Sequence, residues 1–371
     1  MTIIYPSSSL LEKSSALEDA FSASEAYKHP QAPIRMVHLN PERAVGQTRG
    51  RYKARAMTAE IGHPLTGVHS LRKFLCAMYD ACAVQRNLYR KSQILHRDIS
   101  DESIMFAPDT NEYRECNRKG YAEVKFANQV LSKDRSVGPE PRCWVIGLGN
   151  GADLKAERDR GALTERTGTP KFIARSVSSG ELLDKGLSST DIDIPPMEGT
   201  LAEYPRFMHT TEYQHGSRSS ATQSEVEFSH RLFHDAESTF WVIAWTLARS
   251  VGEGSELKEK PHAHFCRFYH IIDRHFPLPR DLDSRLGIGA SSGRYWESVM
   301  HADLAMLAPM LGNMFAYIRP EWAYQPGLNP EHVHEALMRL LLTEIVKLSD
   351  NDTRIVIGGQ EIPPAPRDLQ Y

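Results

Sequence analysis

The chain has 371 residues, of which 41% are hydrophobic and 25% are charged, and its formal net charge at pH 7 is −3. These proportions are close to those of an average soluble globular protein, so they exclude collagen-like, coiled-coil and wholly disordered chains. The near-neutral balance gives no general electrostatic attraction to nucleic acids or anionic membranes, and we expect neither as a partner. At roughly 150 residues per domain, the length allows two domains or one large domain with insertions.

Cysteine usage indicates a reducing compartment. The five cysteines are scattered, odd in number and free of any Cys-x-x-Cys pair, which favours reduced thiols and argues against a zinc site. No basic leader with an apolar core opens the chain, and the longest uncharged stretch, 304–318, is shorter than the roughly 18 residues that suggest a membrane span. We therefore expect an intracellular protein, cytoplasmic or nuclear, with no membrane contact and no metal site of its own.

Residues 1–50 are rich in Ser, Ala, Pro and charge, which predicts a poorly ordered N-terminal segment. Residues 51–65 read as a strand that ends in a turn at Gly62-His63-Pro64. An amphipathic helix follows, with Ser70 as its N-cap and apolar side chains recurring at helical spacing from Leu71 to Tyr89.

The middle of the chain alternates between polar stretches and apolar elements. Residues 107–141 and 178–230 are polar and predict two insertions, the first a looping one. Between them, a short strand at 143–146 runs into the glycine-rich segment 147–151. Residues 240–248 are apolar on every side, which is typical of a helix buried at the centre of a domain.

Three further amphipathic helices are predicted near 265–272, 300–318 and 333–348, and residues 351–371 form a C-terminal tail. Few strands and many helices indicate an α+β, mostly helical protein.

The most informative segment is Ile94–Ser100, which reads Ile-Leu-His-Arg-Asp-Ile-Ser. By itself such a short motif is equally well explained as a polar surface loop. Its context changes this balance, because a helix leads into it, a strand follows it, and Arg166–Phe172 (RTGTPKF) and His234–Trp241 (HDAESTFW) come later in the chain. Together and in this order, these blocks resemble the fungal-type protein kinase family over about residues 51–350.

The resemblance implies a eukaryotic protein-kinase-like fold and ATP-dependent phosphoryl transfer to protein hydroxyls, with ATP and magnesium as cofactors and a protein as substrate or partner. Asp98 then accepts the proton of the substrate hydroxyl, His96 and Arg97 orient the loop, and Asp235 hydrogen-bonds the backbone of that loop. No glycine-rich loop and no strand-borne lysine of the V-A-I-K type precede residue 51, so we expect a mostly helical C-terminal lobe with a truncated or vestigial small β lobe, and the ATP-binding residues stay unidentified.

Two positions depart from the metal-binding pattern of the family. The asparagine expected five residues after Asp98 is Ser103, and the metal-binding aspartate expected after the strand falls on Gly147. A serine hydroxyl is a poorer ligand for magnesium than an amide oxygen, and glycine offers no side chain. Losing one such electrostatic element typically costs on the order of 3 kcal/mol in the transition state. Asp153, six residues after Gly147, could replace the missing metal-binding aspartate only if its carboxylate reached the same position in the site.

These departures imply that phosphoryl transfer is weak or lost, and the alternative is a pseudokinase that acts as a binding or scaffolding module. The glutamate that ends the activation segment in the family is also changed, to Ser176, so its pairing with a buried arginine is not expected.

Two other interpretations concern ligands. Residues 145–152 also resemble a dinucleotide-binding turn, but the charged stretch after them lacks the apolar stripe of the helix that such a turn requires. His262, His264, His270 and His275 lie close together in the sequence, yet none belongs to a His-Glu-x-x-His pattern. We therefore expect neither a nicotinamide enzyme nor a histidine-bound metal.

Overall fold

The computed structural model describes residues 62–118, 122–156, 159, 161–184, 193–197, 213, 226–255, 261–277, 283–288, 293–348 and 352–364. The predicted N-terminal segment 1–50, the predicted strand before residue 62 and any small lobe lie outside the described residues. So does most of the predicted insertion 178–230.

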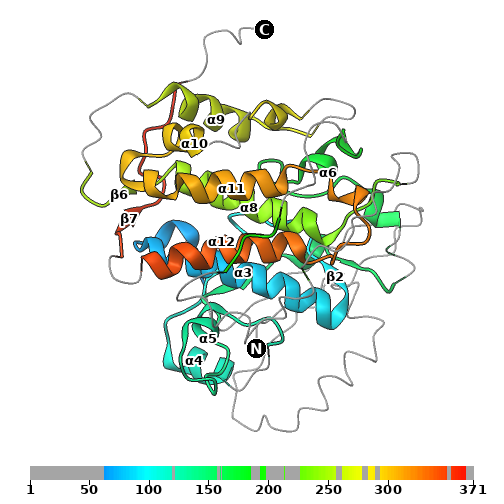
Figure 1. The fold of residues 1–371 in the computed structure, drawn as a ribbon, viewed down its shortest axis with the longest axis horizontal. Helices are drawn as coiled ribbons and strands as arrows, with labels where there is room; N and C mark the ends of the chain where they lie inside the picture. The colour runs from blue at the N-terminus through cyan, green and yellow to red at the C-terminus, as the bar shows by residue number, and fades with distance from the viewer. Residues whose placement is uncertain are drawn as a thin grey trace, which may run out of the picture.

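Helices make up about half of the described chain, and Figure 1 shows α3, α8, α11 and α12 packed together, with α9 and α10 on one side and α4 and α5 on the other. The α-helices are α3 (Leu71–Ser92), α4 (Asn111–Arg118), α5 (Ala127–Leu131), α6 (Arg175–Ser179), α8 (Leu232–Ala248), α9 (Ala263–Asp273), α10 (Gly293–Val299), α11 (Ala308–Ile318) and α12 (His332–Lys347). Among the described helices, none combines the length and the apolarity needed to cross a membrane.

The strands are short and pair into three small antiparallel sheets, β1-β3-β4, β2-β5 and β6-β7. They are β1 (His63–Pro64), β2 (Ile94–Leu95), β3 (Ile104–Phe106), β4 (Cys143–Val145), β5 (Ala152–Asp153), β6 (Val251–Gly252) and β7 (Ile355–Val356). The predicted turn at 62–64 is wrong, because His63 and Pro64 pair with Phe106 and Met105. Proline is compatible with this edge position, since the missing N–H is not needed there.

The core confirms the predicted helical periodicity. Ser70 caps α3 by accepting the amide N–H of Lys73, as its position predicts. Every residue of α8 is buried, which confirms a helix at the centre of the domain. Phe240 and Trp241 of this helix meet Trp296 and Phe315 in a cluster of edge-on aromatic contacts. Each such side chain stabilises the fold by about 1.5–3 kcal/mol through burial.

Residues 107–141 differ from the predicted looping insertion. They contain α4 and α5, and Val124 and Phe126 are buried in the main core. The amide of Asn87 on α3 accepts the N–H groups of Glu123 and Val124 and donates to the carbonyl of Val124, which fastens this segment to the domain. The expectation of a loop is wrong because a few apolar residues among many polar ones are enough to anchor this segment in the core.

The predicted C-terminal tail also contributes to the packed domain. Within residues 352–357, β7 pairs with β6, and the side chain of Ile355 is fully buried. The amide N–H of Leu71 at the start of α3 donates to the carbonyl of Thr353 at 2.9 Å. The segment 352–357 therefore packs against the beginning of α3.

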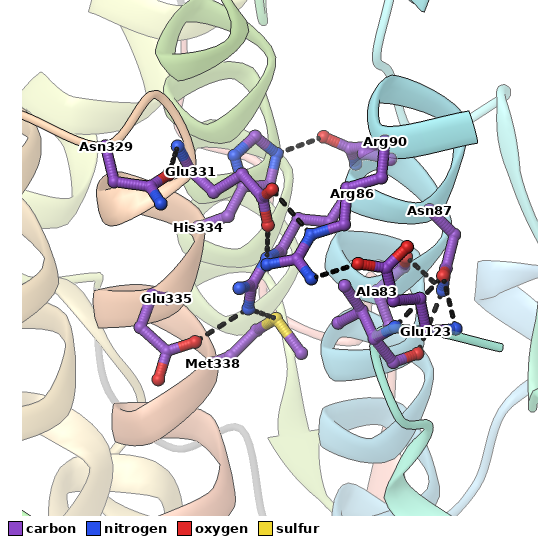
Figure 2. A network of polar contacts seen from close by, with 12 residues as sticks. Ala83, Arg86, Asn87, Arg90, Glu123, Asn329, Glu331, His334, Glu335 and Met338 are labelled. Carbon is purple, nitrogen blue, oxygen red and sulfur yellow. Dashed lines mark hydrogen bonds and ion pairs between the residues drawn. The ribbon is translucent and has the colours of Figure 1, made fainter. Parts of the chain in front are cut away.

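A buried polar network joins α3 to α12. Figure 2 shows Arg86 reaching toward Glu331 and Glu335, with N–O distances of 2.6 and 2.7 Å. Glu331 also pairs with Arg90, and Glu335 with Arg339, so positive and negative side chains alternate along the helix interface. Because each carboxylate has two arginine partners, the charges are neutralised away from water, as buried ions require.

Candidate active site

The loop 96–103 is held at both ends by strands of different sheets. Gln93 ends α3 in a left-handed conformation, with a φ of 55°, and turns the chain into β2. Leu95 of β2 pairs with Ala152 of β5, whereas Ile104 of β3 pairs with Val145 of β4. The short segment between β2 and β3 is therefore fixed relative to both the turn after β4 and the start of β5.

Asp235, in the first turn of α8, holds the backbone of this loop. One carboxylate oxygen accepts the amide N–H of His96 and the other accepts that of Arg97, both at 2.8 Å. Burial raises the pKa of Asp235 above its usual value, and the hydrogen bonds from the two amides oppose this shift because they stabilise the charged form. This is the contact that the family resemblance implies for Asp235.

Arg97, the second residue of the loop, takes a strained backbone conformation. Its φ of 66° lies in the left-handed region, which costs a non-glycine residue roughly 1–2 kcal/mol. The hydrogen bond to Asp235 compensates part of this cost. The guanidinium Nη2 donates to the carbonyl of Ala162, while the buried Nε has no hydrogen-bond partner among the described residues. Arg97 thus ties the loop to the segment that contains Ala162.

His96 connects the loop to the strand β4. Its Nδ1 accepts the amide N–H of Asp98 at 3.3 Å, so the ring proton is on Nε2, which donates to the carbonyl of Ile146 at 3.0 Å. Burial lowers the pKa of His96, which agrees with a neutral ring in this position. The side chain therefore orients the loop through hydrogen bonds without carrying a charge.

Asp98 is half-buried, and both of its carboxylate oxygens are engaged. The hydroxyl of Thr169 donates to one oxygen at 2.7 Å, and the side-chain amide of Asn150 donates to the other at 2.9 Å. Three segments far apart in the sequence meet at this carboxylate. Thr169 and Asn150 belong to segments that the sequence singles out, but no local pattern shows that they converge on Asp98.

Ser103 and Gly147 lie next to each other. A Cβ atom added to Gly147 would be 4.0 Å from the Cβ of Ser103, and the carbonyl of Ser103 accepts the amide N–H of Ile146 at 2.8 Å. The Ser103 hydroxyl accepts the amide N–H of Ser100 at 2.7 Å and donates to the carbonyl of that residue. The two positions that would hold the metal in the family are thus together in space, but neither offers a carboxylate.

Asp153 does not replace the missing carboxylate at this position. It lies in β5 opposite Ile94, and its side chain accepts the amide N–H of Lys155 at 2.9 Å. Within the described parts of the chain, no group of three or more His, Cys, Asp or Glu side chains is placed to hold a metal ion. The residues at Ser103 and Gly147 therefore do not fit magnesium in the way that the resemblance implies.

Ser176 and the buried Arg285 each have a partner close by. Ser176, which stands where the family has a glutamate, forms a hydrogen bond with His234 at 3.0 Å. The fully buried Arg285 pairs with Asp283, two residues before it, and donates to the carbonyl of Ile173. The charge of Arg285 is therefore neutralised by a carboxylate close to it in the sequence.

Arg175, the neighbour of Ser176, is also buried and paired. Its guanidinium lies 2.7 Å from the carboxylate of Glu237 on α8. The same glutamate oxygen accepts the indole N–H of Trp241 at 3.1 Å. Neither this pair nor that of Arg285 is predictable from the spacing of the residues.

The two ligand alternatives do not fit the structure. After β4 the glycine-rich segment forms one turn of 3-10 helix, Leu148–Asn150, and then β5, instead of the α-helix of a dinucleotide-binding turn. The four neighbouring histidines do not converge on one point, although His262 and His264 contact each other. His262 and His264 lie at the start of α9, His270 contacts the carbonyl of Pro364, and His275 contacts Ser178.

Comparison with known proteins agrees with the motif blocks. A family model described as "Fungal protein kinase" matches residues 7–247, which is more than half of the chain. The matched range begins and ends earlier than the resemblance over 51–350, and it stops within α8. Neither the curated proteins nor the solved structures provide a match. The chain belongs to the fungal protein kinase family.

Proposed function

We propose that the described part of the chain is a protein-kinase-like C-terminal lobe that works as a pseudokinase, binding another protein while phosphoryl transfer is weak or lost. The observation that carries this proposal is the pair Ser103 and Gly147, which are adjacent and offer no carboxylate to a metal ion. Phosphoryl transfer depends on metal ions that bridge the β- and γ-phosphates and offset the developing charge. A site without the main metal ligand loses that stabilisation.

The state of Asp98 supports the same proposal. A general base needs a carboxylate oxygen within hydrogen-bond reach of the substrate hydroxyl. Here Thr169 and Asn150 each donate to one oxygen, so a substrate hydroxyl would have to share an oxygen that already accepts a hydrogen bond. The hydrogen bonds instead make Asp98 a connection between the loop 96–103, the turn after β4 and the segment around Thr169.

An active Ser/Thr protein kinase is the second candidate function. The observation in its favour is that the carboxylate of Asp235 accepts hydrogen bonds from the backbone amides of His96 and Arg97, which keeps the loop in one conformation. In this case ATP and magnesium are the cofactors, Asp98 is the base, and a protein hydroxyl is the acceptor. The remaining metal ligand and the ATP-binding residues would then lie outside the described residues.

Two measurements on the purified full-length chain separate these functions. The first is the melting temperature with and without millimolar ATP and magnesium, because a ligand that binds only the folded state raises it. The second is transfer of labelled γ-phosphate to a generic protein acceptor, compared with the variant Asp98→Asn. The pseudokinase proposal predicts transfer far below the roughly 1–100 per second of typical protein kinases. Turnover within that range that depends on both magnesium and Asp98 would contradict it.

The structure also suggests a variant in which the metal position is restored. The space around Gly147 is open, since only the Cβ of Ser103 comes within 4.0 Å of an added Cβ, but its φ of +87° strains any side chain there, so each variant is compared with its own melting temperature without ligand. The double variant Ser103→Asn with Gly147→Asp should therefore gain a magnesium-dependent rise in melting temperature with ATP. The matched control Gly149→Asp, also in open space, should show no such gain.

For the location of the protein, we propose a reducing compartment, the cytoplasm or the nucleus. The four described cysteines, Cys76, Cys82, Cys143 and Cys266, are free thiols. Burial raises the pKa of both Cys76 and Cys82 to about 12, so these two thiols are unreactive at neutral pH. Localisation of a fluorescent fusion in fungal cells would test this proposal.

A further inference from the structure

Three long helices meet at a small group of polar side chains inside the apolar core, which we call the three-helix junction. It consists of Gln85 on α3, Thr239 on α8 and His334 on α12, and each of these residues is at most 2% exposed. The amide Nε2 of Gln85 donates to the hydroxyl of Thr239 at 3.0 Å. The amide Oε1 of Gln85 lies 2.8 Å from Nε2 of His334. One side-chain amide therefore joins all three helices.

The surroundings of His334 fix its protonation state. Burial lowers the pKa of His334 well below its usual value, and the nearby charge of Arg86 (Figure 2) acts in the same direction. The ring is therefore neutral, and its Nε2–H donates to Oε1 of Gln85. Its Nδ1 is buried without a hydrogen-bond partner in the part of the chain that the structure describes. The amide of Gln85 is thereby oriented, with its oxygen toward α12 and its NH₂ group toward α8.

The junction costs stability compared with an apolar core. Burying a hydroxyl, an amide and an imidazole away from water has a desolvation cost that hydrogen bonds offset only in part, and Nδ1 of His334 has no such bond. Apolar side chains of similar volume would pack here without this cost. Hydrogen bonds depend on distance and angle, whereas hydrophobic burial is not directional. The junction is therefore suited to fixing one placement of the helices relative to one another.

The junction lies one helical turn from the hydrogen bonds that hold the loop 96–103. Thr239 follows Asp235 by four residues, so both lie on the same face of α8, and the hydroxyl of Thr239 donates to the carbonyl of Asp235 at 2.9 Å. The carboxylate of Asp235 in turn accepts two backbone amides of the loop. Gln85 belongs to the helix that leads through β2 into the same loop. The loop is thus a continuation of α3 that is bound to the first turn of α8.

A shift of α3 along α8 would therefore act on the loop. The two bonds from the loop to Asp235 are 2.8 Å long. A displacement of roughly 1 Å would break them, because N–H···O bonds extend only to about 3.2 Å. The bond between Gln85 and Thr239 opposes that shift, since the same displacement would break it as well. The same placement keeps Asp98, the third residue of the loop, within reach of its two hydrogen-bond donors.

We propose that Gln85, Thr239 and His334 are positioning residues, which fix the register of α3 against α8 and thereby hold the loop 96–103 in place. The inference goes beyond the proposed function, because it concerns the order of the loop and holds with or without phosphoryl transfer. A merely structural role would lower the stability of the whole domain evenly. A positioning role concentrates the loss at the loop.

Hydrogen exchange of the full-length chain, followed at the amides of His96 and Arg97 and at those of α11 as a reference, tests the proposal. Thr239→Val removes the hydroxyl and keeps the shape of the side chain, so exchange at the two loop amides should become at least about fivefold faster relative to α11, as expected for the loss of one hydrogen bond. Thr239→Ser keeps the hydroxyl and should leave this ratio within about twofold of the wild type, although it loses a buried methyl group. The matched control Thr246→Val makes the same change two turns further along α8 and should also leave the ratio unchanged.

Gln85→Met provides a second variant, because it removes both hydrogen bonds of the amide. It should raise the ratio at least as much as Thr239→Val does, and it takes the place of that variant if Thr239→Val does not fold. Three results would overturn the proposal. One is an unchanged ratio in Thr239→Val, whether exchange stays the same or becomes faster everywhere. Another is a ratio in Thr239→Ser that rises as much as in Thr239→Val, which would assign the effect to packing. The third is an equal rise in Thr246→Val.

Discussion

The substitution Asp235→Asn tests whether one carboxylate keeps the candidate catalytic loop in place. Asp235 is buried and receives the amides of His96 and Arg97 at 2.8 Å each. An asparagine keeps one acceptor oxygen but places an NH₂ group against the second amide. A hydrogen bond to a charged group contributes about 1.5–3 kcal/mol, and a buried amide left unpaired costs about 1–3 kcal/mol. We therefore expect the free energy of unfolding to fall by about 2–4 kcal/mol.

Urea unfolding followed by tryptophan fluorescence measures this loss, because Trp241 and Trp296 lie in the core. Hydrogen exchange at the amides of His96 and Arg97 gives a local readout, with exchange faster on the order of 100-fold if about 2.7 kcal/mol is lost there. The control is Asp98→Asn, whose carboxylate receives only side-chain donors. It should leave exchange at both amides unchanged.

Two outcomes would refute this reasoning. An Asp235→Asn variant within about 0.5 kcal/mol of the wild type would show that the two amides are satisfied without the carboxylate. Equal acceleration of amide exchange throughout the domain would show that Asp235 acts through the packing of α8 alone. The left-handed conformation of Arg97 would then be held by the chain on either side of it.

Three further predictions concern stability. Burial raises the pKa of Asp80 from 3.8 to about 7, so between these pH values the folded state keeps a proton that the unfolded state releases. The free energy of unfolding should therefore fall by up to about 1.4 kcal/mol for each pH unit as the pH rises from about 4 to about 7. Asp80→Asn should flatten this slope in urea titrations at several pH values, and an unchanged slope would contradict the assignment. Arg86→Met should lower the free energy of unfolding by about 3 kcal/mol, because it leaves buried carboxylates without a partner. The double variant with Glu335→Leu should lose less than the sum of the two single variants, and strictly additive losses would argue against coupling between the two side chains. Gly147→Ala should lower the free energy of unfolding, measured with urea, by about 1–2 kcal/mol, because the φ of Gly147 is +87°. Gly149 has no left-handed φ, so Gly149→Ala should lower it less. Equal losses in the two variants would show that backbone strain at Gly147 is unimportant.

The sequence by itself determined the elements that depend on local periodicity. The spacing of apolar residues identifies α3, α8, α9 and α12, because a helical face repeats within a few residues of the chain. It identifies α11 only in part, since the predicted helix at 300–318 begins with a 3-10 helix, Ala302–Leu307, and α11 starts at Ala308. The capping of α3 by Ser70 follows from the same local chemistry. The order of the motif blocks indicates the family, since these blocks combine residue types that carry specific chemistry at fixed spacing.

The tertiary structure alone decided which distant side chains meet. Asn150 and Thr169 converge on Asp98 from 52 and 71 residues away, and no periodicity encodes that approach. The buried guanidinium of Arg285 pairs with Asp283, because a buried charge requires a nearby carboxylate. Residues 107–141 and the C-terminal strand join the core for a similar reason. A segment with a few apolar residues packs only where the rest of the fold provides a surface for them.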